Sequence, residues 1–384
     1  MSARRQMLDN FAAIGAKAPP VLVKVFASSL RGSGLAVKPE ELAGASMVLG
    51  GLGAVIGLIS GGPIIALILA GLGSAGPVFA CKASGGFREA KVARQLEHAG
   101  LDLAQAVHEG KPLAEALRKL AEKSDSPLAE ELMAILGEHA LGLSLTEALE
   151  RFATRVRTAE TVQIVTVLVE HLATGKSPLD PYRLLNFQQP YEMPEVPHAP
   201  PPATFDEAVH RLLAATLDLL EPKQLWERRP PGGTARLLTE RAREALPGLR
   251  LPEAFRMRET ELLQALADDC EGRGPLERLL RCPTVLAIYI VSPTDVFAAT
   301  LPPELVEPST PSGGLETPEG YQRAKLRFRD PEHLRLCTRR ALAPLGADVG
   351  PANPTVEGML PDGWGIGAQL LEGGTLALLM QRAQ

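Results

Sequence analysis

The Gly-Lys-Ser triplet at residues 175–177 has the residue types that close a phosphate-binding loop. Such a loop also needs a glycine five positions earlier, because glycines let backbone N–H groups wrap the phosphates at a helix N-terminus. Glu170 stands at that position, where its side chain would crowd the turn and set a negative charge beside the phosphates. The triplet therefore does not predict a nucleotide site.

Other residues with catalytic or metal-binding chemistry are scattered along the sequence. None of the seven histidines lies in His-x-x-x-His or His-Glu-x-x-His spacing, and the four cysteines form no Cys-x-x-Cys pair. No Gly-x-Ser-x-Gly elbow occurs, and no nucleophile has a recognisable base partner. We interpret the acidic cluster of Asp268, Asp269 and Glu271 as a solvated helix end. We therefore expect no catalytic residue, no metal site, no cofactor and no enzyme activity.

Composition narrows the class of protein. The 384 residues carry a net charge of -5, whereas a nucleic-acid binder normally shows a basic footprint. Only 4% of the residues are aromatic, while Ala, Leu, Gly and Pro are abundant, which suits helices that pack through small residues. We expect two or three domains in a reducing compartment, and no binding to nucleic acid.

Residues 42–81 contain no charged side chain, no histidine and no side-chain amide. A membrane-spanning helix needs about 20 apolar residues, so this window accommodates two. A Ser-Gly-Gly-Pro turn at residues 60–63 divides the window, and basic residues flank it on both sides. Because positively charged flanks stay in the cytoplasm, both ends of this hairpin are expected there. The preceding residues 1–41 predict no secretory signal, since charged residues interrupt their apolar runs.

Small residues form one face on each predicted membrane helix. They recur every four residues, at Gly53, Gly57 and Gly61 on the first helix and at Ala66, Ala70 and Ser74 on the second. Such faces let two backbones approach closely in lipid, where packing replaces the hydrophobic effect as the attractive force. The alternative is a buried soluble hairpin rich in Ala and Gly. Forty residues without a polar anchor favour the membrane hairpin.

Residues 82–184 are amphipathic and contain a repeat. Residues 113–120 match residues 145–152 at an offset of 32, with apolar positions at i, i+4 and i+7 in both copies. Ser144 and Glu147 form a capping-box pattern at the start of the second copy. The pattern predicts a duplicated bundle of helix pairs.

This order of features resembles the cytoplasmic domain of inner-membrane platform proteins of type II secretion and Tad-type pilus machines. The resemblance covers about residues 30–184 and rests on "AGLDLAQAVHEGKPLAEAL", "LGLSLTEAL" and "VEHLATG". The matching positions are Gly110, Leu113, Glu115, Gly142, Leu145, Glu147, Thr174 and Gly175. Because that family closes a helix on a Thr-Gly step, the resemblance implies that Gly175 caps a helix. Such proteins usually return to the membrane, whereas no second apolar span follows here, which implies a partner membrane subunit.

The second half of the chain has a different pattern. Residues 185–203 are proline-dense and lack apolar periodicity, which predicts an extended linker. Residues 204–384 begin with helical patterns, and Thr204 with Glu207 repeats the capping-box signal. From Pro283 onwards short β-branched segments follow, with "TVLAIYIVS" as a central strand and "AKLRFR" among further strand candidates. This half is therefore expected to be α+β.

Residues 206–380 resemble the N-terminal region of Tad-type secretion ATPases. The resemblance rests on "GRGPLERLLRCPTVLAIYIVSPTDVFA", "LRFRDPEHLRLCTRRALAPLG" and "NPTVEGMLPDGWGIGAQL". In that family arginines beside the Leu-Pro-Asp-Gly turn approach nucleotide phosphate. Met359 and Gly365 occupy those positions here, so the charge-assisted phosphate contacts are missing. The resemblance implies a retained fold without its nucleotide role, and a different ligand for that fold stays open.

We expect a mainly α protein, with a membrane helical hairpin at residues 42–81, a cytoplasmic all-α bundle at residues 82–184 and an α+β domain at residues 204–384. The expected function is a non-enzymatic adaptor of the bacterial inner membrane that couples an assembly ATPase to a secretion or pilus platform. The expected partners are that ATPase, other platform subunits, pilin-like proteins and the lipid bilayer, in an oligomer. A membrane-anchored scaffold or regulator outside such a machine is the alternative, and a nucleotide-binding protein is a third.

Overall fold

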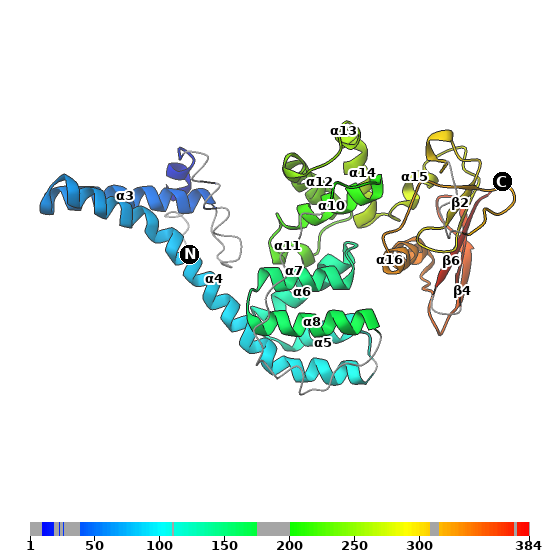
Figure 1. Ribbon diagram of the computed structural model, residues 1–384, viewed down its shortest axis with the longest axis horizontal. Helices are drawn as coiled ribbons and strands as arrows, with labels where there is room; N and C mark the ends of the chain where they lie inside the picture. The colour runs from blue at the N-terminus through cyan, green and yellow to red at the C-terminus, as the bar shows by residue number, and fades with distance from the viewer. Residues whose placement is uncertain are drawn as a thin grey trace. The chain divides into compact units, whose positions relative to one another are not determined.

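The computed structural model of the chain describes residues 10–18, 23, 26, 39–109, 111–174, 200–307, 315–371 and 375–383. Its contacts define two compact units. The first unit holds residues 1–129 and 150–192, and the second holds residues 130–149 and 193–384. The chain is mainly helical, and the strands of the described residues form one antiparallel sheet near the C-terminus (Figure 1). The expectation of a mainly helical chain that ends in an α+β region is confirmed at this level.

The first unit contains two long helices, α3 at Pro39–Gly61 and α4 at Pro63–His108 (Figure 1). Gly62 joins them with a φ of 86°, a backbone conformation that glycine adopts without strain. α4 continues through residue 82, where the sequence predicts the boundary between hairpin and bundle. The sequence changes from apolar to charged at this point, but the following residues still favour a helix. The helix therefore continues across the predicted boundary.

α3 and α4 approach each other through glycines. A Cβ atom on Gly53 would lie 2.3 Å from the carbonyl oxygen of Leu69, and one on Gly57 would lie 2.4 Å from the Cα of Ala66. A Cβ atom on Gly73 of α4 would lie 2.4 Å from the carbonyl oxygen of Leu49 on α3. The backbones of the two helices are therefore in direct contact, and side chains larger than hydrogen do not fit between them. Their role in packing within a membrane stays a prediction.

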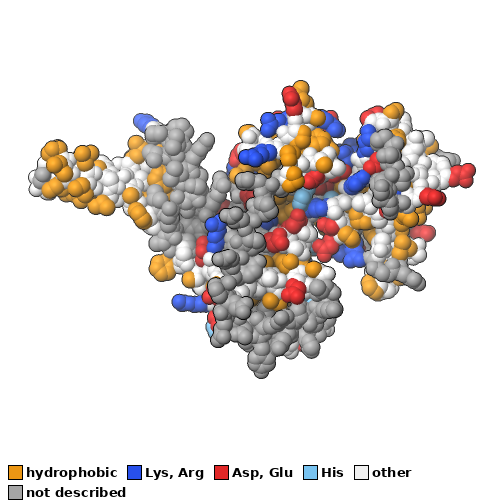
Figure 2. Space-filling view, viewed as in Figure 1, with side chains coloured by type: hydrophobic (Ala, Val, Ile, Leu, Met, Phe, Trp, Pro, Cys, Tyr) orange, Lys and Arg blue, Asp and Glu red, His pale blue; other side chains and the backbone are white. Residues whose placement is uncertain are grey.

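The outward surfaces of α3 and of the first half of α4 are apolar. Leu58, Ile59, Ile64 and Leu67 expose between 62% and 81% of their surface. Figure 2 shows hydrophobic side chains and no charged ones over the free end of this helix pair. Among the described helices, Pro39–Ser60 alone is long and apolar enough to cross a membrane, and only 28% of its apolar window is buried. An apolar helix in the core of a soluble protein would be mostly buried instead.

The first unit also contains α5 at Leu113–Lys123 and α8 at Ala159–Thr174. α5 is amphipathic: Leu113, Leu117 and Leu120 are buried, while Glu115 faces solvent and pairs with the Nζ atom of Lys119 at 2.7 Å. The spacing of the buried leucines gives one apolar face for packing. This face is the one that the sequence pattern predicts.

Two further helices, α6 at Leu128–Ala140 and α7 at Leu145–Arg155, have residues in both units. α7 has the same length as α5 and begins 32 residues after it. α8 ends at Thr174, next to the predicted helix cap. Gly110, Gly175 and residues 185–199 of the predicted linker lie outside the described residues.

Helices form the first layer of the second unit. They are α10 at Phe205–Leu217, α11 at Pro222–Trp226, α12 at Gly233–Ala245, α13 at Glu253–Arg256, α14 at Glu259–Glu271 and α15 at Leu276–Leu280. The hydroxyl of Thr204 accepts a hydrogen bond from the backbone N–H of Glu207 at 3.2 Å, so the predicted N-cap of α10 is confirmed.

The core of this helical layer includes residues from the turn between α6 and α7. Leu141 and Leu143 pack with Leu212 and Leu266, which are fully buried. Burial of these leucines joins residues 130–149 to the C-terminal half of the chain, so the contacts divide the molecule differently from the domains predicted from the sequence.

The sheet has the strand order β3-β2-β1-β6-β5-β4. Its strands are β1 at Ala287–Ile290, β2 at Val296–Ala299, β3 at Gln322–Arg323, β4 at Thr355–Met359, β5 at Trp364–Leu370 and β6 at Leu376–Arg382. β1 lies inside the sheet, as its apolar sequence predicts. The prediction of a strand at "AKLRFR" is wrong, because only Ala324 of that segment bridges to another chain segment.

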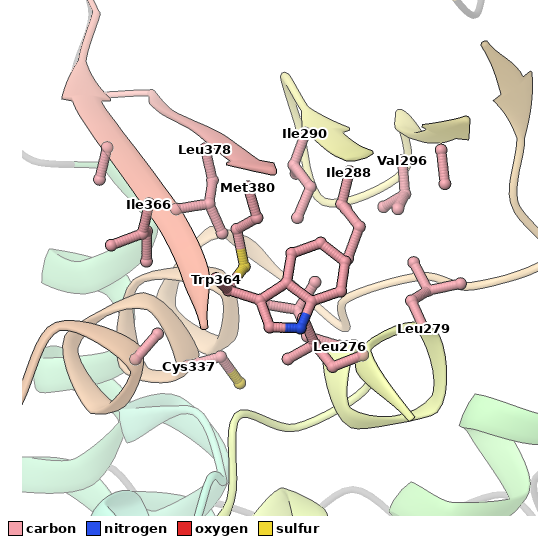
Figure 3. Packing of buried hydrophobic residues seen from close by; sticks show 14 of the residues in the cluster. Leu276, Leu279, Ile288, Ile290, Val296, Cys337, Trp364, Ile366, Leu378 and Met380 are labelled. Atoms are coloured by element: carbon pink, nitrogen blue, oxygen red, sulfur yellow. The ribbon is translucent and has the colours of Figure 1, made fainter. Parts of the chain in front are cut away.

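One face of the sheet packs against α15 and against α16 at Pro331–Leu342. Trp364 lies at the centre of this core, with Leu276, Ile288 and Met380 around its indole ring (Figure 3). Burial of these large side chains fixes α15 and α16 on the sheet, and thereby positions the polar residues at their ends.

The close contact at Gly57 generates a first prediction. Gly57→Ala places a Cβ against backbone, so the helices have to separate, and overpacking of this kind costs on the order of 1–3 kcal/mol. We expect the unfolding temperature of the full chain in detergent to fall by several degrees. Gly51→Ala is the matched control, because no atom lies within 4 Å of its Cβ position and alanine favours a helix. Equal effects of the two variants would contradict the contact.

Candidate functional site

The turn between α6 and α7 is held by arginines from the far end of the sequence, all within the second unit. Arg340 Nη2 donates to the carbonyl oxygen of Ala140 at 2.6 Å, and Arg329 Nη1 donates to the carbonyl oxygen of Gly142. Carbonyl groups at a helix C-terminus lack helical partners and carry partial negative charge, so guanidinium groups suit them. Gly142 has a φ of 112°, which explains glycine at this position. We call residues 140–147 with Arg329, Arg340 and His210 the junction.

Glu147 closes the other side of the junction. Ser144 N and Oγ donate to Glu147 Oε2 at 3.0 and 2.9 Å, and the backbone N–H of Glu147 donates to Ser144 Oγ at 3.2 Å. The predicted capping box is therefore confirmed. His210 Nε2 donates to Glu147 Oε1 at 2.8 Å. Burial alone would raise the pKa of Glu147, but the hydrogen bond and charge of His210, with the Ser144 donors, lower it to about 2.

Arg340 connects the end of α6 with the end of α14. Its Nη1 atom donates to the carbonyl oxygens of Asp269 and Gly272, while Nη2 donates to that of Ala140. One guanidinium group thus binds three backbone carbonyls from two helix ends. Because Arg340 lies on α16, which packs on the sheet, these bonds join the junction to the sheet.

A cavity of about 300 Å³ lies next to the junction, between α10, α14, α15 and the segment before α16. Asp206 stands in its wall: Oδ1 accepts from Arg278 Nη2 at 2.5 Å, and Oδ2 accepts from the backbone N–H of Arg327 at 3.0 Å. Burial raises the pKa of Asp206 although the two arginines oppose that change.

Asp269 and His333 face each other in the same wall. His333 Nε2 lies 3.7 Å from Asp269 Oδ1, and both residues are almost fully buried. Burial raises the pKa of Asp269 from 3.8 to about 7 and, with the charges of Arg329 and Arg340, lowers the pKa of His333 well below 6.5. Near neutral pH the carboxyl of Asp269 therefore gains or loses its proton, while the imidazole of His333 stays neutral.

The burial of the acidic cluster differs from the sequence prediction. Asp268 and Asp269 are 5% and 6% exposed, so the expected solvated helix end is wrong for both residues. Asp268 forms two hydrogen bonds of 2.6 and 2.5 Å with the guanidinium of Arg281, and this pairing compensates the burial of its charge. Within the described part of the chain, no group of three or more His, Cys, Asp or Glu residues is placed to hold a metal ion.

The resemblance-derived positions are distributed over the molecule. Gly142 and Glu147 lie in the junction, and Leu145 is buried beside them, with its backbone N–H 3.5 Å from Glu332 Oε2. Leu113 and Glu115 lie on α5, which belongs to the first unit. The sequence predicts a role for Glu147 and Gly142 but not for the arginines that bind this turn.

The Leu-Pro-Asp-Gly turn joins β4 to β5. Gly363 has a φ of 82°, and Leu360 N donates to the carbonyl oxygen of Trp364 at 2.8 Å, which closes the turn. Asp362 pairs with Arg273 Nη1 at 2.6 Å. Met359, one of the two positions where the sequence resemblance implies an arginine, is exposed. The arginine that contacts Asp362 of this turn is therefore already bound to a carboxylate.

Removal of Arg340 generates a second prediction. Arg340→Ala leaves three carbonyl groups without their charged donor, which costs about 2 kcal/mol or more of unfolding free energy. Its neighbour Arg339→Ala removes only an exposed ion pair with Asp348 and costs less than about 1 kcal/mol. Chemical unfolding of both variants measures this difference, and similar losses would argue against the helix-end contacts.

The buried carboxyl of Asp269 generates a third prediction. Its folded pKa of about 7 lies above the ordinary 3.8, so the folded state retains a proton that the unfolded state has released. The contribution of Asp269 to the free energy of unfolding therefore falls as the pH rises from about 4 to about 7. Asp269→Asn removes the titrating group. We expect the unfolding temperature of this variant, relative to that of the wild type, to be higher at pH 8 than at pH 5. The exposed Asp348→Asn serves as the control, and a difference that does not grow with pH would refute the assignment.

Comparison with known families adds no assignment to this geometry. No protein-family model matches the chain, and no curated protein matches it either.

Proposed function

We propose that this chain is a non-enzymatic adaptor in the inner membrane of a bacterial secretion or pilus-like machine, and that it couples an assembly ATPase to the membrane platform. In this proposal α3 and the first part of α4 form a helical hairpin in the bilayer. The helices that follow form a duplicated cytoplasmic bundle, and the second unit receives the ATPase. The observation that carries the proposal is the exposed apolar surface of α3 and α4.

The dimensions of the two apolar segments fit a bilayer. At 1.5 Å per residue, the uncharged residues 42–60 of α3 and 63–81 of α4 each extend about 28 Å. The hydrocarbon core is about 30 Å thick. Lys38 precedes the pair and Lys82 follows it, which is consistent with two cytoplasmic ends.

The junction supports a coupling role. Residues 130–149 come from the segment that resembles a platform protein, whereas Arg329 and Arg340 come from the segment that resembles an ATPase domain. Both belong to one compact unit and are joined by hydrogen bonds to helix ends and by a shared leucine core. A displacement of one segment would therefore be passed to the other, since packed elements move together.

Two further features support the proposal. α5 and α7 have equal length and begin 32 residues apart, as a duplicated bundle requires. The sequence resemblances imply an assembly ATPase, other platform subunits and pilin-like proteins as partners, in an oligomeric assembly. A membrane-anchored scaffold or regulator outside a secretion machine is the second candidate, and the exposed Met359 at the former phosphate position is the observation that favours it.

Cross-linking in native membranes generates the fourth prediction. The second unit has only two lysines, Lys223 and Lys325, and both are exposed. With an amine-reactive reagent we expect these lysines to cross-link to an ATPase that carries Walker motifs, identified by mass spectrometry. The double variant Lys223→Arg/Lys325→Arg keeps the charges but loses the reactive amines, so these cross-links should vanish.

Cross-links from lysines of the first unit, such as Lys91 and Lys119, serve as the internal control in the double variant. They should persist and should reach other membrane subunits. If Lys223 and Lys325 give cross-links to membrane proteins but none to such an ATPase, the coupling role is wrong and the scaffold interpretation is favoured.

A further inference from the structure

The cavity of the second unit is lined by nitrogen donors that have no acceptor. Among the described residues, four buried side-chain nitrogen atoms without a hydrogen-bond partner belong to residues in this one wall. Three of them are the donors Arg329 Nε, Arg329 Nη2 and His333 Nε2, and the fourth is His210 Nδ1. Buried donors are normally paired, so their concentration around one cavity calls for an acceptor.

Arg329 presents the edge of its guanidinium that suits an oxyanion. Nη1 donates to the carbonyl oxygen of Gly142, whereas Nε and Nη2, which share one edge of the planar group, have no partner. Two parallel N–H groups on one edge match the two oxygens of a carboxylate or phosphate. The carboxylate of Glu147 lies 3.9 Å from Nη1 and is not in hydrogen-bond contact with this edge.

His333 offers a third donor. The backbone N–H of Arg329 donates to His333 Nδ1 at 3.3 Å, so the neutral imidazole carries its proton on Nε2. Nε2 points toward Gly274, where a Cβ would lie 3.4 Å from it. Gly274 has a φ of 62°, and a Cβ there would also lie 2.5 Å from Cys337 Sγ. Glycine at this position adds no side chain over the imidazole N–H, and Asp269 Oδ1, at 3.7 Å from Nε2, is beyond hydrogen-bond distance.

The charges of the wall do not exclude an anion. Asp206 is paired with Arg278, Glu207 with Arg211 and Asp268 with Arg281, so these three carboxylates already have cationic partners. Asp269 lacks such a partner at hydrogen-bond distance, and its carboxyl is protonated over part of the neutral pH range. A protonated Asp269 adds no repulsion and supplies one more donor.

We propose that this cavity binds a small molecule that carries a phosphate or carboxylate group, with the oxyanion held by the free edge of Arg329 and by Nε2 of His333. The cavity of about 300 Å³ is at the lower end of the size range for small-molecule sites. Val209, Ala265 and Phe328 also line it, so the ligand combines the anionic group with a small apolar body. The site is independent of the adaptor role proposed above.

The test is a titration of the full chain in detergent micelles with sodium phosphate and, separately, with sodium acetate, each against sodium chloride of equal ionic strength. Thermal unfolding is followed by tryptophan fluorescence, because a ligand that binds only the folded state raises the unfolding temperature. We expect a saturable rise above the chloride reference. A response to phosphate alone assigns a phosphate ligand, and a response to acetate alone assigns a carboxylate.

Two variants make the titration specific. Arg329→Lys keeps the charge but loses the two-donor edge, and we expect at least a roughly tenfold weaker apparent affinity. Ala265→Met fills the cavity without a change of charge and should weaken binding as well, which covers the case in which Arg329→Lys does not fold. Arg241→Lys, at a partly exposed ion pair with Glu244, is the matched control and should bind as the wild type does.

The inference is overturned if neither anion raises the unfolding temperature above the chloride reference, which would leave ordered water as the occupant of the cavity. It is also overturned if the folded Arg329→Lys and Ala265→Met proteins respond with the affinity of the wild type, since the anion would then bind elsewhere.

Discussion

The apolar surface of α3 and α4 has to be kept away from water, and this constraint governs the environment in which the chain folds. The two helices contact each other through glycine backbone at Gly53 and Gly57, so their larger side chains are left on the outside. In a soluble protein such side chains would face a core, but here they remain exposed. In the proposed function a lipid bilayer supplies the missing apolar environment, and close backbone packing supplies the attraction between helices that the hydrophobic effect does not provide in lipid. In that proposal the anchor raises the effective concentration of the second unit at the membrane, which is the physical basis of the proposed adaptor role.

The junction shows how the second half of the chain is linked to the first. A helix C-terminus ordinarily satisfies its carbonyl groups with a local cap or with water. At the end of α6 the donors are instead Arg340 and Arg329, which lie 200 and 187 residues further along the chain. Leu141 and Leu143 add apolar contacts at the same place. The combination of charged donors and buried leucines makes the turn part of the C-terminal structure. Arg329, which binds Gly142, also has two N–H groups without an acceptor at the neighbouring cavity. An anion bound to them would therefore lie next to the junction.

The sequence was informative wherever a signal is local. Helical periodicity located α5 and α7, hydroxyl caps located the starts of α7 and α10, and β-branched runs located β1 within the sheet. It was not informative about contacts between distant residues. The arginines at the junction carry no local signature, and Asp268 and Asp269 looked like a solvated helix end because their partners come from other segments. The segment "AKLRFR" has the composition of a strand, but the sheet ends at β3 and offers it no full partner. The continuity of α4 through residue 82 was missed because hydropathy and helix propensity change independently.

Alkaline carbonate extraction of bacterial membranes that contain the full chain tests the central claim most directly. Peripheral proteins are released at high pH because their polar contacts are broken, whereas a chain held by apolar helices stays with the lipid. If α3 and α4 are held in the bilayer, the protein remains in the membrane pellet and is released only by detergent. Recovery of the folded full chain in the aqueous fraction, monodisperse without detergent, would contradict it.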